Sequence, residues 1–218
     1  MATTFAQHGL GKLSGLDNPN SFGKGYEYSR TGNPTRGAFE RAIAAVENGA
    51  YGIAFSSGLA STAAIIQTLS TGDHVICIDD VYGGTQRLFR RIVAPGSNIS
   101  FSFMDMADSD AVRAAIQPNT KLVWLESPTN PTLKITDIRA IADVVRSQGR
   151  SDIWLDVDNT FMSPYLQNPL NLGAHIVLHS VTKYIGGHSD VVMGVLALND
   201  ADIFQKLKFV QNGAGAGA

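Results

Sequence analysis

The sequence predicts an α/β fold with a mostly parallel, seven-stranded sheet and helices on both of its faces. Short apolar runs typical of strands alternate along the chain with segments of helical periodicity, and this alternation is the pattern of βαβ units. Strands of this kind are usually covered by helices on both sides. The chain has 218 residues and 44% hydrophobic content, enough for one sizeable domain with a full core.

The strands and helices are predicted from short segments that follow one another along the chain. Strands are expected at 51–55, 75–79, 99–103, 121–125, 153–157 and 175–181, with a possible seventh at 191–198. Helices are expected at 36–48, 58–69, 85–93, 110–116 and 137–147. In the first helix Phe39, Ile43 and Val46 recur at helical spacing, after an Asn33-Pro34 turn, with Thr35 as the expected N-cap.

The two ends of the chain lack this periodicity. Residues 1–35 are rich in Gly, Ser, Asn and Thr and are predicted to form an extended N-terminal arm. Residues 36–212 form the predicted domain. The tail at 213–218 reads GAGAGA and is expected to have no ordered structure.

Composition excludes several classes of function. A net charge of -2 gives no indication of a nucleic-acid or membrane-surface partner. The single cysteine, Cys77, cannot form an internal disulfide and fits a reducing compartment, and no membrane span or signal peptide is recognisable. The five histidines have no zinc-like spacing, so no metal site is expected. We therefore expect a soluble, cytoplasmic protein.

In open α/β sheets, ligands bind beyond the carboxyl ends of the strands. The segments that directly follow the predicted strands are small, polar and reactive: residues 56–60, 80–84, 126–131, 158–160 and 180–183. Independent loops are not expected to share this character. Their convergence predicts a ligand site at this edge of the sheet.

The last of these segments contains the residue with the most reactive side chain. Lys183 follows an apolar run together with Ser180 and Thr182, and a lysine in this position can form an imine with a carbonyl group. The two hydroxyls can bind phosphate, as can the helix that starts at Gly58, because its first amides have no partner inside the helix. Taken alone, however, Lys183 also fits a surface lysine after a buried strand, and Gly58 an ordinary helix start.

Three further side chains at strand ends fit a pyridine ring. Asp158 would keep a pyridine nitrogen protonated through an ion pair, Tyr82 would stack on the ring, and Asn130 would hydrogen-bond a phenolic oxygen. Each also has a structural interpretation. Asp158 and Asn130 are common turn residues, and Tyr82 could be an amphipathic residue at the rim.

Six ordered segments together resemble one enzyme family. The sequence is similar to the trans-sulfuration enzymes of the Cys/Met metabolism family, which depend on pyridoxal 5'-phosphate (PLP), and most to the γ-lyases that act on cystathionine. The resemblance runs from residue 3 to about residue 212. It is carried by 26–36 (YEYSRTGNPTR), 54–60 (AFSSGLA), 79–85 (DDVYGGT), 121–131 (KLVWLESPTNP), 157–165 (VDNTFMSPY) and 179–194 (HSVTKYIGGHSDVVMG).

The resemblance implies the large domain of an aspartate-aminotransferase-like fold (PLP fold type I) and a role for each site residue. Lys183 would hold PLP covalently and shuttle protons, Asp158 would pair with the pyridine nitrogen, Tyr82 would stack on the ring and Asn130 would bond its oxygen. The phosphate would be bound by Gly58, Leu59, Ser180 and Thr182.

The resemblance also implies residues that act outside this pocket. Tyr28 and Arg30 would reach the phosphate of a neighbouring subunit, so that the sites of a homo-oligomer, a homotetramer in the family, are shared. Glu27 and Arg87 would lie near the distal end of an amino-acid substrate.

The implied reaction is the α,γ-elimination of L-cystathionine to L-cysteine, 2-oxobutanoate and ammonia, a step in cysteine biosynthesis and methionine metabolism. Three sibling activities stay open: cystathionine γ-synthase, cystathionine β-lyase and methionine γ-lyase. A cofactor-binding homologue without turnover is a further alternative, because the smaller C-terminal domain of the family is absent from this sequence. Product analysis with L-cystathionine would separate these possibilities.

Overall fold

The computed structural model describes residues 2–218 and contains one seven-stranded sheet. The strand order is β1-β7-β6-β5-β4-β2-β3, and only β7 among these seven runs against its neighbours. The bounds are β1 Tyr51–Phe55, β2 His74–Ile78, β3 Ser100–Met104, β4 Thr120–Glu126, β5 Trp154–Asp158, β6 Ile176–Ser180 and β7 Gly194–Leu198. The predicted fold class, including the seventh strand, is confirmed.

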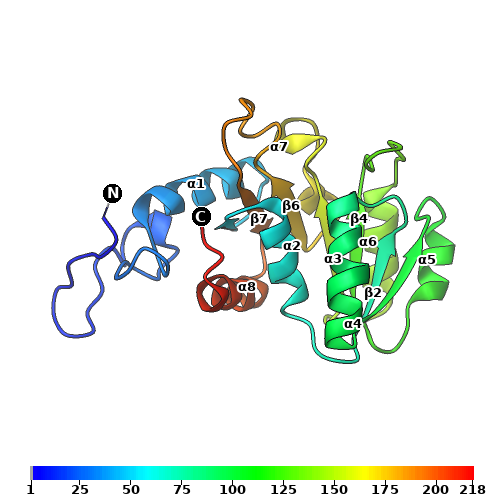
Figure 1. The fold of residues 1–218 in the computed structure, drawn as a ribbon, viewed down its shortest axis with the longest axis horizontal. Helices are drawn as coiled ribbons and strands as arrows, with labels where there is room; N and C mark the ends of the chain where they lie inside the picture. The colour runs from blue at the N-terminus through cyan, green and yellow to red at the C-terminus, as the bar shows by residue number, and fades with distance from the viewer. Residues whose placement is uncertain (1) are drawn as a thin grey trace.

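Helices cover both faces of the sheet (Figure 1). In this view α2 and α3 lie in front of the strands, α8 lies below them beside α2, and α6 lies behind β4, where it packs against α5. The bounds are α1 Pro34–Val46, α2 Gly58–Ile66, α3 Gly83–Leu88, α4 Ala94–Ser97, α5 Ser109–Ala115, α6 Ile138–Ser147, α7 Ser163–Leu166 and α8 Ala201–Ala214. Short 3-10 turns, η1 Pro19–Ser21 and η3 Pro169–Leu172, and a π-helical turn, η2 Phe89–Val93, complete the elements.

The core lies between the sheet and these two helical layers. All residues of β2 and β7 are buried, as expected for strands covered on both faces. Trp124 of β4 and Phe89 of η2 meet edge to face at 5.3 Å between ring centroids and are among the largest fully buried side chains. No helix within residues 2–218 combines the length and the apolar character needed to cross a membrane.

Helix α8 is not among the helices predicted from the sequence. It begins after Asp200, whose side chain accepts hydrogen bonds from the backbone N–H groups of Asp202 and Ile203, and it buries Ile203, Phe204 and Leu207. An N-cap aspartate followed by apolar residues at this spacing is a recognisable signal of a helix start. The sequence therefore carries a local signal for α8 in Asp200 and the apolar residues that follow it.

Replacing the cap residue tests how much α8 contributes to stability. Asp200→Ala removes the acceptor of two N–H groups, at 2.8 and 2.9 Å, and is expected to lower the free energy of unfolding by about 1 kcal/mol. At roughly 2–4 °C per kcal/mol, thermal unfolding followed by circular dichroism should show a Tm lower by a few degrees. Asp200→Asn keeps the acceptor and is the control. Equal Tm values for the two variants would contradict the capping role.

The N-terminal arm is not a simple extended strand. It doubles back on itself, with isolated antiparallel bridges between Thr4 and Tyr28 and between Ser14 and Tyr26. The N-cap of α1 is Asn33 rather than Thr35, because the Asn33 side chain accepts from the backbone N–H groups of Thr35 and Arg36. The helix therefore starts at Pro34, two residues before the predicted start.

The expectation of a disordered tail is wrong. Helix α8 takes in Gly213 and Ala214, and the residues after it lie beside the free edge of β1. Gly217 forms an antiparallel bridge with Phe55, and Ser56 donates its backbone N–H to the carbonyl of Ala216. An unpaired strand edge presents a row of backbone donors and acceptors. These groups give the tail hydrogen-bond partners, although the glycines and alanines of the tail do not by themselves favour an ordered structure.

Candidate active site

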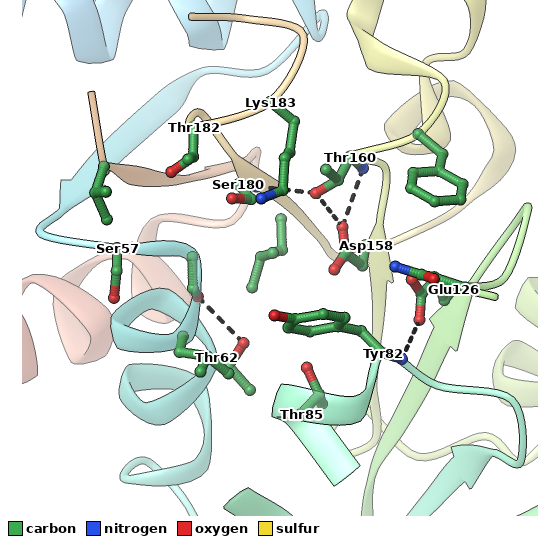
Figure 2. Close-up of a pocket in the computed structure, with 16 residues that line it drawn as sticks. Ser57, Thr62, Tyr82, Thr85, Glu126, Asp158, Thr160, Ser180, Thr182 and Lys183 are labelled. Atoms are coloured by element: carbon green, nitrogen blue, oxygen red, sulfur yellow. Dashed lines mark hydrogen bonds between the residues drawn. The ribbon is translucent and has the colours of Figure 1, made fainter. Parts of the chain in front are cut away.

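A cavity of about 310 Å3 opens at the carboxyl ends of β4, β5 and β6, where α2 and α3 begin. Figure 2 shows its side chains converging from these elements. The lining residues are Ser57, Gly58, Leu59, Thr62, Tyr82, Thr85, Glu126, Asn130, Asp158, Thr160, Phe161, Leu178, Ser180, Thr182, Lys183 and Val192. The residues predicted to hold the ring and phosphate of PLP within one subunit thus lie around one space.

The N-terminus of α2 forms one wall of the cavity. Ser57 caps the helix by accepting from the backbone N–H of Ala60, which leaves the N–H groups of Gly58 and Leu59 without an intrahelical acceptor. A Cβ atom on Gly58 would lie 3.0 Å from Cβ of Ser180, so a glycine lets the helix start approach β6 closely. Free amides and the positive end of the helix dipole favour an anion here.

The two hydroxyls predicted to bind phosphate differ in their surroundings. Ser180 Oγ has no hydrogen-bond partner within residues 2–218, whereas Thr182 Oγ1 exchanges hydrogen bonds with the backbone of Met193, at 3.1 Å from N and 3.3 Å from O. Ser180 is therefore free to donate into the cavity. Thr182 also joins the segment after β6 to the start of β7.

Asp158 is held at the end of β5 through one of its two oxygens. Oδ1 accepts from the backbone N–H of Thr160 at 3.0 Å and from its hydroxyl at 2.5 Å, and that hydroxyl in turn accepts from Ser180 N–H at 2.9 Å. Burial raises the pKa of Asp158, and the hydrogen bonds from Thr160 oppose this shift. No donor within the described chain contacts Oδ2, so this oxygen is available to a ligand.

Tyr82 lies across the cavity and is tied to β4 through its backbone (Figure 2). Its N–H donates to Oε2 of Glu126 at 2.8 Å. The ring packs over Gly84, where a Cβ atom would come within 2.5 Å of it. Burial, and secondarily the charge of Asp158, raise the pKa of Glu126. A flat aromatic face and two carboxyl groups thus form the floor of the cavity.

Asn130 lies on a loop that Asp80 fixes from the end of β2. Asp80 Oδ2 accepts from the hydroxyl of Thr129 at 2.5 Å and from the backbone N–H of Thr132 at 3.0 Å. The hydroxyl of Thr132 donates to the same oxygen, and the hydrogen bonds from the Thr129 and Thr132 hydroxyls are the main cause that lowers the pKa of Asp80. Asn130 therefore lies between two threonines, Thr129 and Thr132, that are both held by hydrogen bonds to Asp80.

Lys183 stands in a turn directly after β6. Its backbone N–H donates to Ser180 O at 3.1 Å, and its carbonyl accepts from Gly187 N–H at 2.8 Å. The side chain is solvent-exposed and also lines a second hollow next to the cavity, beside Phe161 and Tyr184. The amine can thus be reached by a small molecule from outside.

Four predicted site residues lie outside the cavity: Glu27, Tyr28, Arg30 and Arg87. All four are exposed, and the first three belong to the arm. The Arg30 guanidinium stacks near the Tyr28 ring at 5.7 Å and donates to both the backbone carbonyl and the side-chain oxygen of Asn212, each at 2.7 Å. Within this chain these side chains do not complete the site.

Several lining residues were not predicted, among them Thr62, Thr85, Glu126, Thr160 and Phe161. Glu126 and Thr160 belong to the strand-end segments noted in the sequence, and both follow from the same rule that pointed to Asp158. Thr62 and Thr85 instead face the cavity from the second turn of α2 and the first turn of α3. Their position depends on how these helices pack, which no local pattern reports.

The cavity fits PLP, as its donor set shows. The free amides of Gly58 and Leu59 suit the phosphate, and the unpartnered Oδ2 of Asp158 suits a protonated ring nitrogen. The flat ring of Tyr82 suits stacking, and the amine of Lys183 suits covalent attachment to an aldehyde.

Comparison with known proteins identifies the family. Residues 1–218 match the family described as Cys/Met metabolism PLP-dependent enzyme. The chain belongs to this family. It is 54% identical over 216 residues to a cystathionine gamma-lyase of Dictyostelium discoideum and 53% identical over 214 residues to a probable cystathionine gamma-synthase of Herpetosiphon aurantiacus. Among solved structures, cystathionine gamma-lyase from Lactobacillus plantarum, complexed with L-serine, matches with a TM-score of 0.90 at 45% identity.

The chain spans about half the length of the relatives it matches. The alignments cover 98–99% of this chain, but 52% of the Dictyostelium protein, 63% of the Herpetosiphon protein and 53% of the Lactobacillus structure. PLP as the cofactor and the type I fold follow from family membership. The relatives carry two different activities at similar identity, so similarity alone does not select one reaction.

Gly194 sets how closely the start of α2 approaches the sheet. A Cβ atom on Gly194 would lie 2.2 Å from the backbone oxygen of Ser57, the cap residue of α2. Gly194→Ala is therefore expected to push α2 outward, to cost about 1–3 kcal/mol of stability and to weaken PLP binding. Thermal unfolding with and without PLP measures both effects. Gly96→Ala, where no atom lies within 4 Å, is the control, and an unchanged PLP-induced rise in Tm would contradict the prediction.

Proposed function

We propose that this chain binds PLP through Lys183 and supplies the cofactor site of an enzyme that cleaves L-cystathionine by α,γ-elimination, giving L-cysteine, 2-oxobutanoate and ammonia. The observation that supports this most directly is the cavity itself. It places Lys183, Asp158 and the free amides at the start of α2 around one space.

Each wall of the cavity has a separate task. The N–H groups of Gly58 and Leu59 and the Ser180 hydroxyl would hold the phosphate. Asp158 Oδ2 would accept from the ring N–H, and the Tyr82 face would fix the plane of the ring. Bound PLP supplies an electron-withdrawing pyridinium ring. The amine Nζ of the exposed Lys183 would take the proton from substrate Cα and return it to the neighbouring carbons.

Covalent attachment to Lys183 has a direct chemical test. Borohydride reduction of the PLP-loaded protein, followed by peptide mapping, should place the pyridoxyl group on Lys183. Lys183→Arg should abolish the label, whereas Lys12→Arg, on the exposed arm, should leave it unchanged. A label on another lysine, or no label with excess PLP, would rule out the assignment.

The products formed from L-cystathionine distinguish the candidate reactions. Cleavage of L-cystathionine at Cγ releases L-cysteine and 2-oxobutanoate, whereas cleavage at Cβ releases a different thiol and a different oxo acid. We expect the first pair, because the names of the relatives, cystathionine gamma-lyase and cystathionine gamma-synthase, both refer to the γ position. Label on Lys183 without either product would instead support a cofactor-binding chain without turnover.

We further propose that the protein is a cytoplasmic homo-oligomer in which Tyr28 and Arg30 act on the site of a neighbouring subunit. Both are exposed, neither lines the cavity of its own chain, and Arg30 would exchange its contacts with Asn212 for a phosphate. Mixing an Arg30→Ala subunit with a Lys183→Ala subunit should restore PLP binding above that of either parent. An equal affinity in the mixture would count against a shared site.

A further inference from the structure

Glu126 is a buried carboxyl group in the cavity to which the proposed chemistry gives no role. It ends β4 and lies in register with Asp158, the last residue of β5, so two carboxyl groups stand side by side at the same edge of the sheet. Only 5% of Glu126 is exposed. Two neighbouring carboxylates in such a place repel each other, so one of them is favoured to be protonated, and the group with fewer hydrogen-bond donors takes the proton more readily.

The donors around the two groups are unequal. Asp158 Oδ1 accepts two hydrogen bonds from Thr160, and Oδ2 is open to a ligand. Glu126 accepts one, from Tyr82 N–H to Oε2. The other titratable groups around Glu126 are Asp80 and Cys77, from the end of β2 and from β2 itself, with Tyr82 and Lys183 across the cavity. Asp80 adds to the repulsion, and the buried thiol supplies no positive charge.

We propose that Glu126 is a positioning residue that works as a neutral carboxylic acid. It holds the backbone of Tyr82 through Oε2 and leaves Asp158 as the anionic partner of the PLP ring nitrogen. Figure 2 shows this contact beside the Tyr82 ring and Asp158. The inference rests on the proposed function in one respect, that PLP binds in this cavity.

The contact matters because it holds the backbone N–H of Tyr82 at the start of α3, while the Tyr82 carbonyl accepts from Gln86 N–H within the helix. It is the N-cap residue, yet its side chain makes no capping hydrogen bond, and the residue is 45% exposed. The orientation of the ring therefore depends on its backbone, and the backbone N–H of Tyr82 depends on Glu126. A charged Glu126 would accept from this N–H at least as strongly, but it would place a second negative charge beside Asp158 and raise the free energy of the ionised pair.

Three variants separate the effect of a charge on Glu126 from the effect of its hydrogen bond with Tyr82 N–H. Glu126→Gln is neutral and keeps an acceptor for Tyr82 N–H, Glu126→Asp keeps the acid but is one methylene too short, and Glu126→Leu removes the acceptor. The visible absorbance and circular dichroism of bound PLP are recorded between about pH 6 and about pH 10. Infrared spectra of the PLP-free protein report whether a protonated carboxyl band is lost in Glu126→Gln. Asp110→Asn, an exposed carboxyl, is the control.

We expect Glu126→Gln to match the wild type in PLP affinity, in visible circular dichroism and in the pH midpoint of the visible absorbance of bound PLP. Its infrared spectrum should lack one protonated carboxyl band. Glu126→Leu and Glu126→Asp should bind PLP about two- to tenfold more weakly and change the circular dichroism of the bound ring. A pH midpoint shifted in Glu126→Gln by about one unit or more, or an unchanged carboxyl band, would overturn the inference, because it would show that Glu126 is charged. If the wild type binds no PLP, the proposed function fails, and the infrared comparison still decides the state of Glu126.

Discussion

Asp158→Asn is expected to weaken PLP binding by about ten- to a hundredfold. The substitution keeps the shape of the side chain and an oxygen for Thr160, but it removes the negative charge that would face the ring nitrogen from Oδ2. A hydrogen bond to a charged group contributes about 1.5–3 kcal/mol, and each 1.4 kcal/mol corresponds to a factor of ten in affinity. Fluorescence titration of the PLP-free protein with PLP measures the loss.

The same strand supplies a matched control. Asp156→Asn makes an identical substitution two residues earlier on β5, at a position outside the cavity, and should leave PLP affinity unchanged. Loss of folding does not explain the expected effect at Asp158, since burial raises the pKa of this residue and its charge does not stabilise the PLP-free protein. Comparable affinities for Asp158→Asn and the wild type would show that Asp158 is not the partner of the ring.

The position of this site could be predicted because parallel strands bring their carboxyl ends to one edge. Asp158 and Ser180 are far apart in sequence, yet each ends its strand, and Thr160 joins them through hydrogen bonds. The strand pattern alone was sufficient to bring these residues together. Lys183 lies only three residues after Ser180, and the turn in which its N–H donates to Ser180 O keeps it at the same edge of the sheet.

What the sequence did not predict depends on packing between distant segments. The role of Glu126 as acceptor for Tyr82 requires knowing that β4 lies between β2 and β5. The hydroxyl of Thr182 is shared with Met193 only because β7 returns beside β6. The tail pairs with the edge of β1, which the preceding helix α8 places within reach. None of these contacts has a signature in local periodicity.

Asp156 is a carboxyl group inside the apolar core. It is fully buried at the centre of β5, and neither of its oxygens has a hydrogen-bond partner within residues 2–218. Its register neighbours are Trp124 on β4, whose indole N–H is also without a partner, and Ile176 on β6. Burial, and secondarily the charge of Asp158, raise the pKa of Asp156 well above its usual range.

Asp156→Val is expected to stabilise the protein, and more so at high pH. A carboxyl whose pKa is raised on folding binds its proton more tightly in the folded state, so its contribution to stability is largest below the unfolded pKa of about 3.9 and is lost as pH rises towards the folded pKa. Between the unfolded pKa and the folded pKa, keeping this carboxyl protonated lowers the free energy of unfolding by about 1.4 kcal/mol for each pH unit. Valine has no proton to hold, fills a similar volume and favours strands.

The gain should be about 1 kcal/mol near pH 4 and should grow towards pH 8 by about 1.4 kcal/mol for each pH unit that lies below the folded pKa of Asp156, with roughly 2–4 °C in Tm for each kcal/mol. Thermal unfolding across this pH range measures it. Asp152→Asn is a control of opposite sign, because Arg150 and Lys121 lower the pKa of that exposed carboxyl, and its loss should destabilise the protein at neutral pH but not in acid. A gain for Asp156→Val that does not grow with pH would mean that Asp156 finds a compensating partner in solution.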